Sequence, residues 1–271
     1  MQIRLSDHFT LGRLLRFTLP SVIMMVVASL YSVVDGLFVS NLVGDMALSA
    51  VNIMFPVTMI IGAFGFMLGT GGSAIVARTM GEGDRELAQR YFSLIIYSVI
   101  GLGGVLSIVC ALLAGPIARL AGASDLLLND CVAYGQVMLG GSVIFMLQTT
   151  FQSFFVVAER PMLGLVFSVA AGVTNMVLDY VFIALLDMGI AGAAWATVAS
   201  QAVSAVLLSA HFLLGMSKVR LRARLVRPWR PLVRRIFVMG ASPFGVQIAT
   251  AVTMILYNWQ SLAYGGDIGV G

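Results

Sequence analysis

Two acidic residues, Asp35 and Asp179, lie inside long apolar stretches and are the side chains best placed to do chemistry. A carboxylate at a bilayer centre costs about 2.5–3.5 kcal/mol on an insertion scale, so acids at such positions mark functional sites more often than structural ones. Asn175 precedes Asp179 by four residues, which places both side chains on one face of a helix. Their oxygens suit a hard cation. They could equally hold a proton, because burial and a like-charged neighbour favour the neutral acid.

The depth of each residue in its span adds Thr197 to this group. Asp35, Asp179 and Thr197 would each lie ~10–13 Å below the outer surface, at 1.5 Å of rise per residue. We therefore predict that these three residues occupy one layer, with Asn175 one turn deeper. Structural alternatives are that Asp35 ends the first helix, that Asp179 is a satisfied structural acid, or that Thr197 bonds to its own helix.

Two further polar residues, Asn52 and Gln148, lie inside other apolar spans. They could line a substrate cavity or bridge neighbouring helices, and bridging is the commoner role. The chain contains no paired-histidine motif, no Ser/Lys dyad and no cysteine cluster with metal-ligand spacing. The sequence therefore favours a protein that is not an enzyme and that carries no resident cofactor.

The composition requires that these residues be positioned by membrane helices. Of 271 residues, 59% are hydrophobic and 10% are charged, with a mean hydropathy of +0.99, whereas a soluble domain has roughly 25% charged residues. Only helices suit such long apolar spans, since lipid offers no partner to free backbone groups. We predict an all-α, polytopic transmembrane bundle with spans near residues 15–40, 47–76, 91–115, 131–157, 161–186, 190–214 and 236–262.

The distribution of Lys and Arg predicts the orientation. If the N-terminus lies inside, every basic residue except Arg119 falls on the inner side. This bias predicts a multi-pass protein of the inner (cytoplasmic) membrane with a cytoplasmic N-terminus, in contact with membrane lipids. The net charge of +4 does not indicate nucleic acid, because the charges follow this rule. The basic run at 218–235 is interpreted as a connector along anionic headgroups, with a lipid-sensing segment as the alternative.

The seventh span repeats the opening of the first. Pro20 and Asp35 follow two arginines, and Pro243 and Asn258 follow another two at the same spacing. Both spans start on the same side, which favours a parallel pseudo-repeat over a chance resemblance. We predict three parts: a six-span N-terminal lobe over 1–215, a basic cytoplasmic connector over 216–235, and the first span of a truncated second lobe over 236–271.

Several runs carry a family resemblance over nearly the whole chain. They are Tyr31–Ser40 in the first span, Ala77–Asp84 in the following loop, Asn175–Tyr180, Gly189–Thr197, Tyr257-Asn258 and Gly265–Asp267. In order and spacing they resemble the multidrug and toxic compound extrusion (MATE) family, and the first two spans look closest to its MepA-like bacterial branch.

The resemblance implies a twelve-span, two-lobed antiporter that exports cationic or amphipathic drugs or toxins in exchange for Na⁺ or H⁺. It places the coupling-ion site on Asp35, Asn175, Asp179 and Thr197, and it implies that a missing C-terminal lobe is needed for full activity. One alternative is a lipid-linked oligosaccharide flippase of related architecture, although no Lys or Arg lies mid-span to meet a phosphate. The other is an inactive transporter fragment.

Overall fold

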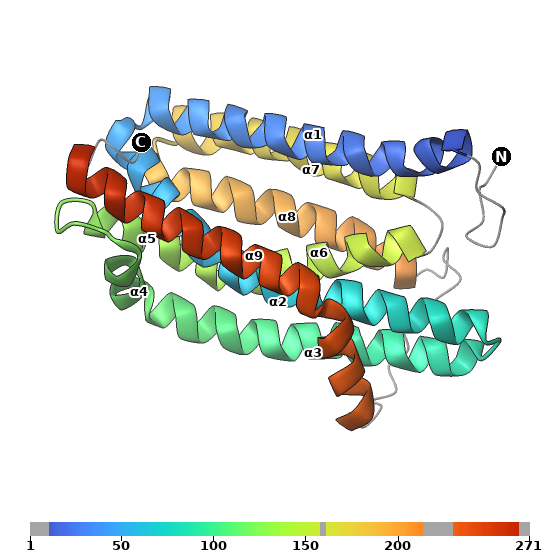
Figure 1. The fold of residues 1–271 in the computed structure, drawn as a ribbon. Coiled ribbons are helices and arrows are strands. Elements are labelled where there is room, and N and C mark those ends of the chain that lie inside the picture. The colour runs from blue at the N-terminus through green and yellow to red at the C-terminus, as the bar shows by residue number, and fades with distance from the viewer. Residues whose placement is uncertain (1–10, 158–160, 214–229, 266–271) are drawn as a thin grey trace.

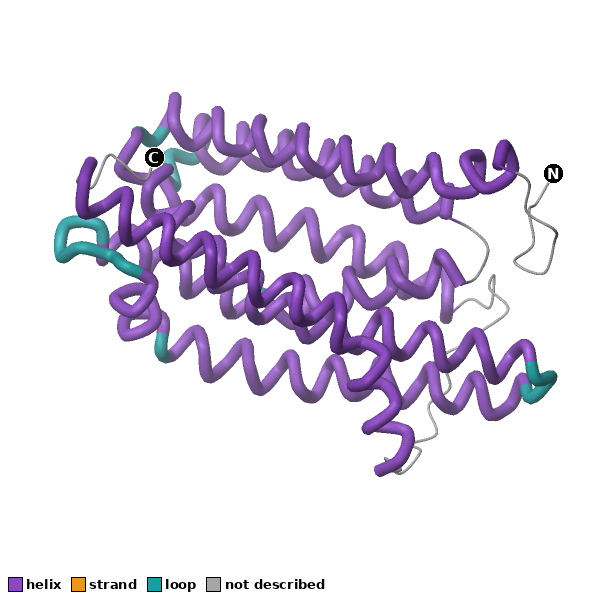
Figure 2. The backbone as a smooth tube through the Cα atoms, viewed as in Figure 1, coloured by secondary structure: helices purple, strands orange, loops and turns teal. Residues whose placement is uncertain are grey.

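Helices form all the regular secondary structure of residues 11–157, 161–213 and 230–265, which are the residues that the computed structural model describes (Figure 2). The long elements are α1 (Leu11–Leu42), α2 (Asp45–Gly81), α3 (Arg85–Leu112), α5 (Leu128–Gly140), α6 (Ser142–Val157), α7 (Pro161–Asp179), α8 (Gly189–Leu213) and α9 (Arg230–Gly265). Two short elements are the helix α4 (Ala114–Ala121) and the π-helix η1 (Tyr180–Leu185).

The bundle has the predicted class. Within the described residues, six helices are long and apolar enough to cross a membrane, and α5 with α6 makes a seventh candidate span bent by 49°. Each predicted span coincides with one of these helices or with the bent pair. The prediction of an all-α, polytopic bundle is therefore confirmed (Figure 1).

The break between α5 and α6 is held by two serines. The Ser107 hydroxyl on α3 accepts a hydrogen bond from the Val143 amide at 2.9 Å and lies 2.9 Å from the Ser142 hydroxyl. The chain turns here because Gly141 interrupts the helix, which leaves amides at the start of α6 without a partner in the preceding turn. Ser107 supplies one such partner from a neighbouring helix.

Small residues on α2 bring α6 close to it. A Cβ atom at Gly65 would lie 2.8 Å from the Met146 Cα atom, and one at Gly69 would lie 2.9 Å from the Thr150 Cα atom. The Thr150 hydroxyl also donates to the Gly65 carbonyl at 3.1 Å. Such close approach supplies the van der Waals contact that holds helices together in lipid.

An aromatic cluster joins α3, α6 and α8 on the other side of α6. The Phe92 ring packs edge-on against Phe154 at 4.7 Å between centroids, and Phe151 stacks on Phe212 at 5.5 Å. Phe92, Phe154 and Phe212 are fully buried. These three helices thus share one aromatic core.

Helix α9 packs along α2 in antiparallel register. Gly71 of α2 contacts the Ile236 carbonyl, and Gly240 of α9 contacts the Met67 carbonyl. Farther along, the Asn258 side-chain amide donates to the Asn52 carbonyl at 3.0 Å. The helix that would open the predicted second lobe is therefore fitted closely to the first lobe in this chain (Figure 1).

The element boundaries bear on the predicted domain limits. Helix α8 ends at Leu213, close to the predicted end of the first lobe at residue 215. Helix α9 begins at Arg230, so residues 230–235 of the predicted connector belong to α9. The rest of the connector, residues 216–229, lies outside the described residues, and the division into lobes stays a prediction.

Candidate cation site

The candidate site is built where α1 lies beside α7 (Figure 1). Gly172 of α7 lies against Tyr31 of α1, since a Cβ atom there would be in ordinary van der Waals contact with the Tyr31 Cβ atom at 3.6 Å. The two helices run in the same direction, so the next turn of each places Asp35 close to Asn175 and Asp179. Helix α1 continues to Leu42, two turns beyond Asp35, so the alternative that Asp35 ends the first helix is wrong.

The carboxyl groups of Asp35 and Asp179 face each other at a distance that would allow a hydrogen bond if one of them carried a proton. Asp179 is fully buried and Asn175 nearly so. Among the described residues, neither carboxylate oxygen of Asp179 and neither polar atom of the Asn175 amide has a hydrogen-bond partner. The structure therefore brings together three of the four residues predicted for the cation site.

This geometry has a large electrostatic cost if both acids are ionised. Two like charges about 4 Å apart repel by ~4 kcal/mol at an effective dielectric constant of 20. Burial adds the cost of removing each charge from water. A shared proton or a bound cation removes most of this cost, because either neutralises one negative charge. The pair is thus suited to exchange such a positive charge reversibly.

Two tyrosines border the acid pair and were not predicted. The phenols of Tyr31 on α1 and Tyr134 on α5 lie close enough to interact electrostatically with Asp35 and with Asp179. Tyr31 precedes Asp35 by one turn, so the sequence did carry a signal for it. Tyr134 comes from a distant span, and nothing in its neighbouring sequence points to the site.

Thr197 lies on α8 and is half-buried. Its carbonyl accepts a hydrogen bond from the Ser200 hydroxyl at 2.8 Å. Within the described part of the chain, the structure does not join the Thr197 hydroxyl to either carboxylate by a hydrogen bond. Its place among the cation ligands therefore stays a prediction.

A cavity of about 280 Å³ lies between α1, α2, α6, α7 and α8, on the side of the acid pair toward the starts of α1 and α7. Tyr31 lines the cavity and borders the acids, so it links the two. The remaining polar lining consists of amides and hydroxyls: Gln148, Thr149, Gln152, Ser168, Ser200 and Gln201. The Gln152 amide donates to the Ser168 hydroxyl at 3.1 Å, which spans α6 and α7.

The two residues predicted to line a substrate cavity have different positions. Gln148 lines this cavity. Asn52 lies at the contact between α2 and α9, where its carbonyl accepts the hydrogen bond from Asn258. A substrate contact by either residue stays a prediction.

A π-helix begins directly after Asp179. In η1 the backbone ring is one residue wider than in an α-helix, and the Leu186 amide accordingly donates to the Val181 carbonyl at 3.0 Å. Gly192 of α8 accommodates the widened turn, since a Cβ atom there would lie 3.1 Å from the Phe182 carbonyl oxygen. Such π segments are rare and frequently occur at functional sites.

Sequence comparison identifies the family of the chain. The family model described as MatE matches residues 20–181, which is more than half of the chain. The Multidrug export protein MepA of Staphylococcus saprophyticus is 25% identical over 252 residues, covering 93% of this chain and 56% of the relative. MepA of Staphylococcus aureus strain MSSA476 matches with the same identity and coverage. The chain thus spans about half the length of these curated relatives.

Solved structures give the same result. A structure described as the inward-facing conformation of a multidrug resistance MATE family transporter has a TM-score of 0.83 at 28% identity, covering 89% of this chain and 55% of that one. A MOP superfamily transporter from Pyrococcus furiosus, for which a reverse polarity of the binding pocket suggests a different function, has a TM-score of 0.82 at 29% identity, covering 94% and 57%. The family model thus covers most of the first five spans, and the MepA relatives and the solved structures align with nearly all of the chain. The chain therefore belongs to the MatE family of multidrug and toxic compound extrusion transporters.

Proposed function

We propose that this chain forms the coupling half of a secondary antiporter that exports cationic or amphipathic compounds in exchange for Na⁺ or H⁺. Asp35 and Asp179 bind the coupling ion, Asn175 supplies an amide oxygen, and Thr197 supplies a hydroxyl when the ion is bound. The whole activity belongs to a protein with a second lobe, because the relatives are about twice as long.

The observation that carries the proposal is the facing pair of acids. Asp179 is completely buried beside Asp35, and neither of its oxygens meets a donor among the described residues. A purely structural acid would be satisfied by hydrogen bonds, since an unpaired buried charge is expensive. An acid pair that needs a positive charge to be stable supports a role in binding and releasing one.

The cavity supports a cationic or amphipathic substrate. The side chains that line it carry no formal charge and combine amides and hydroxyls with Met25, Phe66 and Phe145. A flippase for a phosphate-bearing lipid would need basic groups to meet the phosphate, and the lining of this cavity offers none. The cavity therefore favours drug export over the flippase alternative.

The acid pair gives the first testable prediction. In a full-length protein that carries this chain, Asp179→Asn should abolish gradient-driven drug efflux, because the pair loses the charge that binds the coupling ion. Efflux is measured in everted membrane vesicles under separately imposed Na⁺ and pH gradients, and the gradient that drives the unmodified protein identifies the ion. Efflux that is unchanged in Asp179→Asn would rule out the proposed site.

Asp187→Asn is the matched control, because it removes the same charge from the exposed turn after η1. Efflux should be retained in this variant. Expression of the 271-residue chain alone tests the remaining alternative, that of an inactive fragment. We expect it to insert into the membrane without conferring drug resistance, whereas resistance from the chain alone would contradict the need for a second lobe.

A further inference from the structure

A second hollow, distant from the acid pair, lies at the basic end of the bundle. A groove of about 340 Å³ is formed by the end of α2, the start of α3 and the start of α9. The residues that line it are Ile75, Arg78, Thr79, Glu82, Leu87, Tyr91, Leu232, Arg235 and Met239. None of these residues contributes to the cavity beside the cation site.

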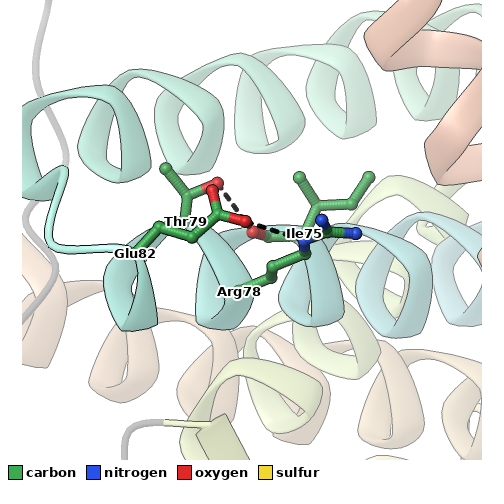
Figure 3. A network of polar contacts seen from close by, with 4 residues as sticks. All are labelled: Ile75, Arg78, Thr79 and Glu82. Atoms are coloured by element: carbon green, nitrogen blue, oxygen red, sulfur yellow. Dashed lines mark hydrogen bonds and ion pairs between the residues drawn. The ribbon is translucent and has the colours of Figure 1, made fainter.

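The polar rim of the groove has an excess of positive charge. Arg78 donates from Nε to the Glu82 carboxylate at 2.9 Å, as Figure 3 shows, and its two terminal amino groups take no part in this bond. Arg235 faces the same groove from α9, and among the described residues no carboxylate pairs with it. Two arginines and one glutamate leave a net charge of +1, with guanidinium donors free to bind an anion.

The inner part of the groove is apolar on both walls. Ile75 lies one turn nearer the middle of the bundle than Arg78 on α2, and Met239 follows Arg235 by one turn on α9. Leu232 is buried, and Val238 and Met239 leave apolar surface exposed on α9. A ligand that fills the groove therefore presents an anionic group at the end of the bundle and hydrocarbon toward its middle.

We propose that this groove binds an anionic phospholipid, with its phosphate at Arg78 and Arg235 and its acyl chains along α9. Basic pockets between transmembrane helices are known sites for anionic headgroups. Arginine suits a phosphate because its planar fork can form two parallel hydrogen bonds. The Tyr91 side chain also lines the groove, whereas the buried Thr79 hydroxyl donates to the Ile75 carbonyl at 3.0 Å. This site is independent of the proposed transport activity.

Its consequence for the fold is local. The lipid would join α9 to the hairpin of α2 and α3, at the end of the bundle opposite the hydrogen bond between Asn258 and Asn52. The start of α9 would then be held to the first lobe by a ligand as well as by direct packing. A leaflet rich in anionic lipid would favour this position of α9.

The test is native mass spectrometry of the purified 271-residue chain with dioleoyl phosphatidylglycerol and, in parallel, dioleoyl phosphatidylcholine. We expect one saturable phosphatidylglycerol site and no comparable phosphatidylcholine site. In Arg78→Gln/Arg235→Gln, affinity should fall by about fivefold for each arginine removed. Arg78→Lys/Arg235→Lys keeps both charges but loses the planar fork, so its affinity should lie between that of the Gln variant and that of the unmodified chain. A circular-dichroism spectrum equal to that of the unmodified chain shows that each variant is folded.

Arg85→Gln/Arg90→Gln is the matched control, because both arginines lie on α3 at the same end of the bundle and outside the groove. An equal loss in this control would indicate attraction to the general surface charge and would overturn the proposal. Competition by inorganic phosphate or glycerol phosphate as strong as that by the lipid would also overturn it, because the groove would then bind free phosphate. Equal binding of phosphatidylcholine would exclude the anionic headgroup.

Discussion

At the scale of single residues, the bundle uses buried polar groups in two different ways. Ser107 is buried and has hydrogen-bond partners, since its hydroxyl accepts a hydrogen bond from the Val143 amide and forms another with the Ser142 hydroxyl. Asp179 is equally buried, but its oxygens have no hydrogen-bond partner among the described residues. The first arrangement stabilises a helix break. The second stores an unfavourable interaction that a positive charge can relieve, which is what an ion-coupled transporter requires.

The second prediction concerns Ser107. Ser107→Ala should lower the free energy of unfolding by about 1–3 kcal/mol, because a buried amide at the start of α6 loses its acceptor. SDS-induced unfolding of the purified chain measures this change. Ser98→Ala is the control, since the Ser98 hydroxyl donates to the Leu94 carbonyl of its own helix at 2.8 Å. Equal effects of the two substitutions would show that Ser107 does not hold the break.

The role of a residue can be predicted from sequence more easily when its residue type is rare in membrane helices. Asp35 and Asp179 were predicted to lie together, because acids in apolar spans are rare enough to stand out. Tyr134 was missed because tyrosine is common in membrane helices. Only the folded structure brings its phenol close to Asp35 and Asp179. Thr197 was placed by its depth and by the family resemblance, and depth leaves the rotation of α8 undetermined.

At the scale of elements, α2 is a central helix that packs against α3, α5, α6 and α9. Its glycines contact α6 at Gly65 and Gly69 and contact α9 at Gly71. The backbone of α9 approaches so closely that any side chain at Gly71 would meet the Ile236 carbonyl. One helix therefore provides close contacts on two faces, and both depend on the absence of a Cβ atom.

The third prediction tests this contact. Gly71→Ala should destabilise the chain by about 1–3 kcal/mol, because the extra methyl group forces α9 away from α2. Gly101→Ala on α3 is the control, since nothing lies within 4 Å of a Cβ atom there. The control should leave stability unchanged or raise it by up to about 1 kcal/mol. Unfolding in SDS compares the two variants, and a neutral Gly71→Ala would contradict a tight crossing.

Long elements were predictable and short ones were not. The spans follow from hydropathy, which is strong over twenty residues and weak over eight, so α4 was missed in the loop after α3. The bend of 49° between α5 and α6 was also missed. Gly140 and Gly141 mark its place, but glycine pairs occur in many straight membrane helices. The π-helix after Asp179 has no signature in its composition, because its wider turn is accommodated by Gly192 on another helix.

At the scale of the whole molecule, one end of the bundle is basic and the other is nearly free of Lys and Arg. The loop between α2 and α3 is flanked by Arg78, Arg85 and Arg90, whereas the loops at the opposite end carry Arg119 beside Asp125. The positive-inside rule assigns the first end to the cytoplasm. It would also place the phospholipid groove in the cytoplasmic leaflet, where anionic lipids attract basic groups.

The fourth prediction is this orientation. In a chain with Cys110→Ala and Cys131→Ala, a membrane-impermeant maleimide added to intact cells should label Asp125→Cys and should not label Gly81→Cys. Both positions are exposed at opposite ends of the bundle. Permeabilised cells provide the control, since both variants should then react. The reverse pattern in intact cells would place the N-terminus outside.

The π-helix after Asp179 has a consequence for how this site could change in evolution. Because η1 holds one more residue per hydrogen-bonded ring than an α-helix, deletion of one residue from Tyr180–Leu185 could be absorbed by reverting to ordinary helix. The helix on either side would then keep its register, because the residue lost is the extra one that the wider ring holds. Asp179 would stay beside Asp35, so this segment can lose one residue in a single step without loss of the acid pair or of the fold, whereas the same deletion in an ordinary α-helix would turn the residues on its two sides by about 100° relative to each other.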